Sequence, residues 1–224
     1  MYRNTFLSVM FLACCFNGSL CAQSDAQIYE RTCDAKTYPF SDPSPVATPN
    51  NSYYPYFRFD GFSMQAQEKQ WKMVVLENDY VKLTVTPEIG GKIWGAIDKV
   101  NNKEFVYTNG VVKFRDVAMR GPWTSGGIEF NFGIIGHAPT CSTPIDYLTK
   151  KNVDGSVSCH IFSYEWITRT VWNVEISLPK DKAYFTTHTT WFNQSSIDQP
   201  YYQWMNAGYA TKTGTRFYYP GTYS

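Results

Sequence analysis

Short runs of alternating apolar and polar residues recur from Gly61 to the end of the chain, and no helical periodicity interrupts them. Residues 81–86, VKLTVT, alternate in the way expected of a strand with one buried face. Turn compositions, such as END at 77–79 and PEIGG at 87–91, separate the runs. Further strands are predicted at 71–76, 92–98, 104–107, 111–119, 127–132, 143–150, 156–164, 168–178, 183–192, 201–209 and 215–219. This spacing predicts an all-β, antiparallel sandwich or barrel.

Length and charge place few limits on function. A chain of 224 residues fits one domain, or one domain with an appendage. The net charge of +1 gives no reason to expect nucleic acid or an acidic surface as partner. Aromatic residues make up 17 % of the chain, including 7 Trp and 17 Tyr. This composition is typical of a β-rich fold whose binding surface stacks on sugar rings.

The first 22 residues have the features of a secretory signal peptide. Arg3 gives a positive start, residues 6–16 form an apolar stretch too short to span a bilayer, and 20–22 read LCA. We expect cleavage after Ala22 and export to the periplasm or the exterior. A lipoprotein acylated at Cys14 or Cys21 is the alternative. No later stretch is apolar and long enough to predict a membrane span.

Residues 23–60 are predicted to be an extended N-terminal leader. They are rich in Ser, Asn and Tyr and contain prolines that interrupt helices and central strands, at Pro39, Pro43, Pro45, Pro49 and Pro55. Aromatic residues near the end of the segment predict that it packs on the domain that follows. The expected organisation is therefore a signal peptide (1–22), a leader (23–60) and a β-domain (61–224).

Cys33, Cys141 and Cys159 remain after removal of the signal peptide. An odd number permits at most one internal disulfide. Cys141 and Cys159 lie across the predicted hairpin of 143–150 and 156–164, so we expect these two to pair if any disulfide forms. Their spacing matches no zinc motif, and neither a metal nor a cofactor is expected.

The segment 120–137, RGPWTSGGIEFNFGIIGH, concentrates the most unusual chemistry of the chain. Its strand places Gly127, Glu129 and Asn131 on one face, which we expect to be polar and open. The opposite face should point into the core and carries Ile128, Phe130 and Phe132. Loops on either side contribute further polar and aromatic residues, namely Arg120, Trp123 and His137. The composition is that of a sugar subsite; an antiparallel edge strand with a solvated face is the alternative.

Glu129 and His137 are the candidate catalytic residues. Glu129 is suited to act as an acid or base, or to hold a sugar hydroxyl. A solvated carboxylate, or one paired with Arg120, is the structural alternative. His137 lies in a glycine-rich loop beside the strand and is the histidine best placed for proton transfer. A loop histidine bonded to the backbone is its alternative.

Substrate-binding roles are predicted for Arg120, Trp123, Asn131, Trp204 and Asn206. Trp204 and Asn206 fit a stacking platform beside an amide that reads hydroxyl groups, although a tryptophan in a strand also suits a core. Trp123 follows a proline in a loop, where an aromatic side chain is suited to facing a ligand. The other two histidines lie inside alternating strands and are predicted to be structural, namely His160 and His188.

Three segments resemble known proteins. Residues 78–107, NDYVKLTVTPEIGGKIWGAIDKVNNKEFVY, resemble the opening of galactose-mutarotase-like supersandwich domains. Residues 191–209, WFNQSSIDQPYYQWMNAGY, resemble the paired central strands of that superfamily. Residues 120–140 resemble exported proteins typical of gut Bacteroidetes, in which a mutarotase-like domain is often followed by tetratricopeptide repeats (TPR). The resemblance implies an antiparallel β-supersandwich with sugar binding in a groove.

The resemblance also implies that the chain is incomplete. Such domains are usually longer, so we expect an N-terminal fragment of the fold. Mutarotases use a histidine acid and a late glutamate base, and the strand around Trp204 that should carry the histidine has none. Mutarotase activity is therefore not expected, whereas sugar binding is.

Three classes of function follow from these observations. No nucleophile motif, P-loop or dinucleotide fingerprint is present. A carbohydrate-active enzyme of the glycoside hydrolase, lyase or epimerase type is one class, and a non-catalytic carbohydrate-binding module is the second. Glycoside hydrolysis generally needs two carboxylates, and Glu129 is the only candidate on the groove face, which favours a binder. A structural β-sandwich that supports protein partners is the third class, and the oligomeric state is left open.

Overall fold

The computed structural model describes residues 24–41, 61–117, 122–133, 136–165, 168–211, 213–219 and 221. The expected signal peptide, much of the expected leader and Arg120 lie outside these residues. The described chain is nearly all-β and mostly antiparallel, which confirms the predicted fold class. No helix in the described residues is long and apolar enough to cross a membrane.

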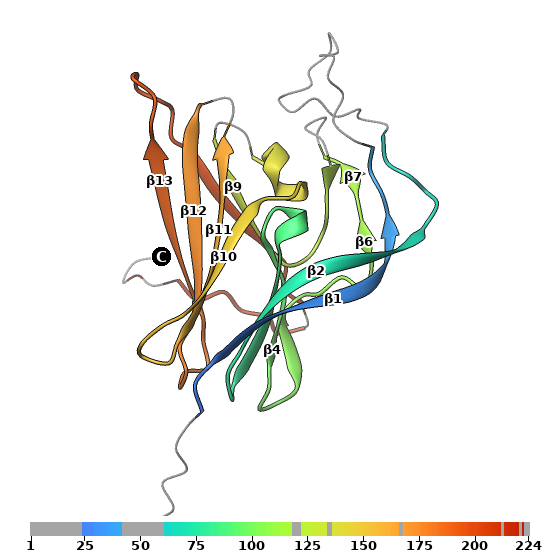
Figure 1. The fold of residues 1–224 in the computed structure, drawn as a ribbon. Helices are drawn as coiled ribbons and strands as arrows, with labels where there is room; N and C mark the ends of the chain where they lie inside the picture. The colour runs from blue at the N-terminus through green and yellow to red at the C-terminus, as the bar shows by residue number, and fades with distance from the viewer. Residues whose placement is uncertain are drawn as a thin grey trace, which may run out of the picture.

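The larger sheet has eight strands and curls along its length (Figure 1). Its strand order is β14-β9-β4-β3-β2-β1-β6, and β5 pairs with β4. The pairs are antiparallel except for β1 and β6, which run parallel. The strands are β1 (Gln27–Tyr38), β2 (Gln67–Glu77), β3 (Val81–Thr86), β4 (Lys92–Asp98), β5 (Lys103–Val106), β6 (Val112–Lys113), β9 (Ile128–Phe132) and β14 (Gln203–Ala207).

A four-stranded antiparallel sheet lies against the larger one and has the order β10-β11-β12-β13 (Figure 1). Its strands are β10 (Asp146–Lys151), β11 (Val157–Glu165), β12 (Thr170–Leu178) and β13 (Thr186–Asn193). Shorter elements complete the described fold: the pair β7 (Arg115–Asp116) and β8 (Pro122–Trp123), and the 3-10 turns η1 (Pro87–Ile89) and η2 (Pro139–Ser142).

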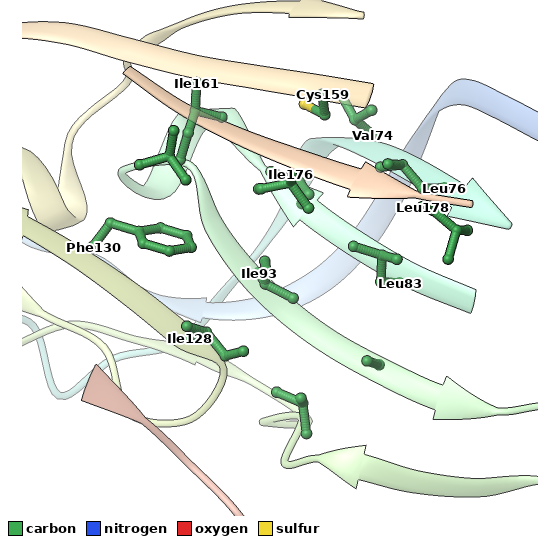
Figure 2. Packing of buried hydrophobic residues seen from close by; sticks show 14 of the residues in the cluster. Val74, Leu76, Leu83, Ile93, Ile128, Phe130, Cys159, Ile161, Ile176 and Leu178 are labelled. Carbon is green, nitrogen blue, oxygen red and sulfur yellow. The ribbon is translucent and has the colours of Figure 1, made fainter. Parts of the chain in front are cut away.

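The main core fills the space between the two sheets. In Figure 2, Ile93 and Phe130 of the curled sheet lie opposite Ile161 and Ile176 of the four-stranded sheet. At one end of this core, the rings of Phe132 and Trp172 stack at 4.6 Å. The predicted core face of β9 is thus confirmed, because Ile128, Phe130 and Phe132 all belong to this cluster.

Asn78 joins the two sheets through hydrogen bonds. It lies in the turn between β2 and β3 and is only 5 % exposed. Its Nδ2 donates to the carbonyl oxygens of Pro179 and Lys182 at 2.7 and 2.8 Å, in the connection between β12 and β13. Its Oδ1 accepts from the backbone N–H groups of Tyr80 and Val81. One amide side chain therefore fixes a turn of one sheet to a connection of the other.

The strand predictions differ from the structure in three places. Residues 27–38, assigned to the leader, form β1, which pairs along β2 in the curled sheet. Most of its side chains are exposed, so it lacks the apolar alternation that identifies a buried strand. Residues 111–119 do not form one strand: β6 and β7 occupy 112–116 as two short pieces. Residues 215–219 are not a strand, and their aromatic side chains are exposed.

The expected Cys141–Cys159 disulfide is absent, because all three described cysteines are free thiols. Cys159 lies in the core between the sheets, and burial raises the pKa of its thiol to about 12. Cys141 lies in η2, where its Sγ is 3.8 Å from the carbonyl oxygen of Pro122. The hairpin itself forms as predicted. Cys141, however, precedes it in a separate turn, and its Sγ lies near the Pro122 carbonyl and not near Cys159.

Candidate functional site

The polar face of β9 is buried, which corrects the prediction of an open face. Glu129 is 2 % exposed and Asn131 is 0 % exposed. The alternation itself is as predicted, since the apolar residues of β9 enter the core between the sheets. The chain around Thr124 and the turn at His137 contact the opposite face and enclose its polar groups.

Glu129 contacts three polar side chains within this enclosure. Its Oε1 accepts a hydrogen bond from Asn131 Nδ2 at 2.9 Å and lies 2.7 Å from His137 Nδ1. Its Oε2 is 3.5 Å from Lys92 Nζ. Two residues that the sequence analysis proposed as catalytic are therefore in direct contact. The alternative of a pair with Arg120 involves a residue outside the described chain, and the cation found beside Glu129 is Lys92.

Lys92 is a member of the site that the sequence analysis missed. It is the first residue of β4, is 1 % exposed, and donates to the backbone carbonyl oxygen and the hydroxyl of Thr124. A sequence signal was available, because Lys92 opens the apolar run IWGAI at residues 93–97. A lysine so placed either ends the strand in solvent or is buried with a partner, and the sequence does not identify the partner.

Burial disfavours the charge of both Glu129 and Lys92, but neighbouring groups offset this effect to different extents. Burial raises the pKa of Glu129, but the hydrogen bond from His137, the positive charge of Lys92 and the Asn131 amide together outweigh it and lower the pKa. Burial also lowers the pKa of Lys92, and the negative charge of Glu129 only partly opposes this. The carboxylate of Glu129 is accordingly ionised at neutral pH.

His137 is held in a fixed position beside the carboxylate. Its backbone has a φ of 49°, in the left-handed region that non-glycine residues seldom adopt. The next residue, Ala138, donates its N–H to Asn131 Oδ1 at 2.7 Å, which ties the turn to β9. The side chain of His137 is 15 % exposed, so part of the imidazole remains accessible while Nδ1 faces Glu129.

Two tryptophans flank the imidazole of His137. The ring of Trp123 in β8 lies 5.6 Å from it, and the ring of Trp204 in β14 lies 4.4 Å from it, both edge-on. A side chain at Gly136 would place its Cβ 2.5 Å from the Trp204 ring, so glycine is required for this approach. The structure thus brings together Glu129, Asn131, His137, Trp123 and Trp204.

Asn206 is placed beside the site by strand pairing. In the β14–β9 register, Asn206 is opposite Glu129 and Trp204 is opposite Asn131. Directly opposed residues of antiparallel strands point to the same face. Asn206 is half-buried, and its side chain makes no hydrogen bond to any described residue. The remaining predicted binding residue, Arg120, lies outside the described residues.

Two buried polar atoms of the site lack a hydrogen-bond partner among the described residues: Glu129 Oε2 and Trp123 Nε1. One is an acceptor and the other is a donor. Lys92 lies near both, since its Nζ is 3.5 Å from Glu129 Oε2 and 5.9 Å from the centre of the Trp123 ring. A hydroxyl group or a water can donate to one such atom and accept from the other.

The other histidines and clefts lie apart from these residues. His160 lies 3.7 Å from Glu175 on the adjacent strand, and His188 is exposed in β13. Three clefts, of about 700, 410 and 280 Å³, are not lined by Glu129 or His137. The described residues contain no group of three metal-ligating side chains.

These features define an all-β domain of two facing sheets with a buried lysine–glutamate pair that supports a partly exposed histidine. The chain belongs to the family described as "Domain of unknown function (DUF5107)", whose model matches residues 48–224.

A solved structure of a TPR-domain containing protein from Parabacteroides distasonis ATCC 8503 is similar, with a TM-score of 0.75 and 27 % sequence identity. The match covers 83 % of this chain and 32 % of that one, so the chain spans about a third of its neighbour's length. The TPR domain of the neighbour agrees with the resemblance found in the sequence. These comparisons do not confirm a galactose-mutarotase-like fold.

Proposed function

We propose that the domain binds a carbohydrate at His137, with Trp123 and Trp204 against the sugar and Glu129 behind the imidazole. The observation that carries this proposal is the placement of His137, whose Nδ1 contacts a buried carboxylate while its ring lies between two tryptophans. The resemblance to mutarotase-like domains supports the same ligand class. The signal-like residues 1–22 support an exported protein.

The Glu129–His137 contact gives the imidazole a defined chemistry. When His137 is neutral and Nδ1–H donates to Glu129, Nε2 is an acceptor with a free lone pair. That nitrogen can accept a hydrogen bond from a sugar hydroxyl, or take its proton. The lowered pKa of Glu129 keeps the carboxylate ionised and able to orient the ring.

The neighbouring side chains favour a sugar over a purely apolar ligand. Aromatic rings stack on the C–H faces of sugars, and the amide of Asn206 can both donate to and accept from hydroxyl groups. Glu129 is the single carboxylate in contact with His137 among the described residues. Because glycoside hydrolysis generally uses two carboxylates, we propose binding as the primary activity, with proton transfer at His137 as an additional capability.

Titration calorimetry of the full chain against plant, host and bacterial oligosaccharides, guided by a glycan array, tests this proposal. Trp204→Ala and His137→Gln should each weaken binding of the selected sugar by about 5- to 100-fold, the range for one lost partner in a polar site. His188→Ala, in the exposed part of β13, is the matched control and should bind like the wild type. Unchanged affinity in both site variants would contradict the proposal.

Glu129→Gln separates binding from catalysis. If it abolishes turnover of a bound sugar while binding persists, the domain is an enzyme that depends on the Glu129–His137 pair. If no turnover is detected in the wild type, the domain is a binding module.

A second candidate function is a non-catalytic interaction module for proteins. The observation that favours it is a set of exposed large apolar side chains from β13 onward, namely Phe192, Ile197, Tyr201, Met205, Tyr209, Phe217, Tyr218 and Tyr219. Exposed apolar surface of this extent is common at protein–protein contacts. A wild-type chain that binds no glycan, and whose self-association or partner binding depends on these residues, would favour this function.

A further inference from the structure

We infer that the cleft between Arg169, just before β12, and the connection after β13 binds the anionic group of an acidic ligand, with Arg169 as the anion-binding residue. The identification of the ligand as an acidic sugar rests on the proposed function, whereas the anion site rests on the cleft itself. The cleft has a volume of about 700 Å³, which is large enough for a small sugar.

The lining of the cleft is polar and carries one cation. Arg169 and Tyr164 contribute from one side, and the other side is formed by Gln194, Ser195, Ser196, Ile197 and Gln199, most of which carry amide or hydroxyl groups. None of these described lining residues is acidic, and Asp198, in the same connection, is not one of them. An arginine surrounded by neutral donors and acceptors is suited to a carboxylate or a sulfate next to hydroxyl groups, because its guanidinium can donate two parallel hydrogen bonds.

Arg169 has no acidic partner within salt-bridge distance among the described residues. Some surface cations do have one, such as Lys82 and Lys99, which lie 3.6 and 2.7 Å from Glu77. The guanidinium of Arg169 is therefore available to an anion that enters the cleft.

The backbone of Arg169 is held in an uncommon conformation. Its φ is 57°, in the left-handed region where glycine is normally favoured. Buried hydrogen bonds below the turn maintain this geometry: Glu165 accepts from Thr168 N–H and its hydroxyl, and the Thr168 hydroxyl contacts that of Thr170 at 2.8 Å. A charged residue at a position suited to glycine is a sign that its side chain has a use there.

The opposite wall of the cleft is pre-formed. Asn193 Oδ1 accepts from the N–H and the hydroxyl of Ser195, and its Nδ2 donates to the carbonyl oxygen of Ile197. Gln194 and Ser196 make no hydrogen bond to described residues and line the cleft. Because the loop is already ordered, a ligand need not supply the free energy of ordering it.

The cleft lies at the same end of the sandwich as the His137 site. Figure 1 shows that β11 and β13 both end at the side of the sandwich where η2 lies. Gly133, directly after β9, is so close to the base of the turn that a Cβ there would lie 2.9 Å from Glu165 Cγ. A chain of sugar units bound at His137 could therefore carry an acidic unit toward Arg169.

Calorimetry of the full chain with matched pairs of ligands tests the inference. The probes are oligogalacturonides, their neutral galactose counterparts of equal length, and sulfated galactose oligosaccharides. The wild type should prefer the acidic member by at least about 10-fold, the range for hydrogen bonds to a charged group. Arg169→Gln should remove this preference and change neutral binding by less than about 2-fold. Arg31→Gln, an exposed arginine of β1 that lines a different cleft, is the matched control.

Arg169→Gly provides a second variant that keeps the fold. Glycine suits a φ of 57°, so this variant should be folded and should lose the acidic preference like Arg169→Gln. Equal binding of acidic and neutral ligands by the wild type, unchanged preference in both variants, or no binding of any acidic probe would each overturn the inference. If the Arg169 variants lose the acidic preference and Trp204→Ala binds like the wild type, the anion site stands and the proposed His137 site fails. If Trp204→Ala weakens binding and the Arg169 variants keep the preference, the His137 site stands and the anion site fails.

Discussion

At the scale of single residues, the Lys92–Glu129 pair is the feature with the largest energetic consequence. Both side chains are at most 2 % exposed, and their charged atoms lie 3.5 Å apart. Transfer of each charge out of water is unfavourable, and the partner and the surrounding hydrogen bonds offset that cost. Loss of one partner would leave the other charge buried alone, so the pair behaves as one unit.

Lys92→Met should lower the free energy of unfolding by about 3 to 5 kcal/mol, the usual cost of breaking a buried ion pair. Urea or guanidinium unfolding of the full chain provides the measurement. Lys82→Met is the control, because Lys82 pairs with Glu77 at 3.6 Å and is 31 % exposed, and it should cost less than about 1 kcal/mol. The double variant Lys92→Met/Glu129→Gln should recover part of the loss. Equal effects of the two lysine substitutions would contradict the described burial.

The sequence predicted part of this site. Glu129 and Asn131 share a face because of strand alternation alone, and His137 was recognised from its glycine-rich surroundings. Lys92 could not be assigned, because it reaches Glu129 through the β4–β9 pairing and no local pattern encodes that contact. The burial of Glu129 was also missed, since alternation distinguishes the two faces of a strand but does not reveal what covers each of them.

At the scale of elements, β9 is a strand with two buried faces of opposite character. One face belongs to the apolar core between the sheets, and the other contributes Glu129 and Asn131 to the candidate site. The apolar face therefore fixes the position of the polar one. A shift of β9 by one residue would exchange the faces, so core packing and site geometry depend on the same register.

Phe130→Ala should lower the free energy of unfolding by about 3 to 5 kcal/mol, because it removes a buried aromatic side chain and leaves a cavity. Phe192→Ala in β13 is the matched control: this side chain is 62 % exposed, and its loss should change stability by less than about 0.5 kcal/mol. Chemical denaturation of both variants measures the two changes in the free energy of unfolding. A loss below about 1 kcal/mol for Phe130→Ala would be inconsistent with the packing in Figure 2.

Strands with a clear alternation were predictable, and exposed or interrupted strands were not. The hairpin of β10 and β11 was found because its turn composition and alternation agree. β1 was missed because its partner β2 is remote in sequence and its side chains are mostly exposed. Residues 215–219 include three aromatic residues, and they were predicted to form a strand from β-propensity alone, which is a weak guide without a pairing partner.

At the scale of the whole molecule, the two sheets are connected by apolar packing and by the Asn78 side chain. All four hydrogen bonds of the Asn78 side chain are to backbone groups, two within its own turn and two in the other sheet's connection. Asn78 therefore stabilises both its own turn and the position of one sheet relative to the other.

Asn78→Ala should destabilise the protein by about 2 to 4 kcal/mol, because it removes four hydrogen bonds of a buried side chain to backbone groups of both segments. Thermal and chemical unfolding provide the measurement. Asn101→Ala is the control, since Asn101 is an exposed turn residue whose Nδ2 donates to Asp98 at 2.6 Å, and it should cost less than about 1 kcal/mol. Equal stability of the two variants would show that Asn78 does not hold the sheets together.

The position of β13 at the edge of its sheet affects how the protein behaves in concentrated solution. Among the described strands it pairs only with β12, and its sequence TTHTTWFN contains neither proline nor lysine. Proteins commonly place such residues on exposed edges to prevent one molecule from adding its strand to another. Apart from His188, no ionisable residue on β13 could oppose this contact. Oligomers joined edge to edge, and aggregates that grow from them, are therefore expected to form through this strand.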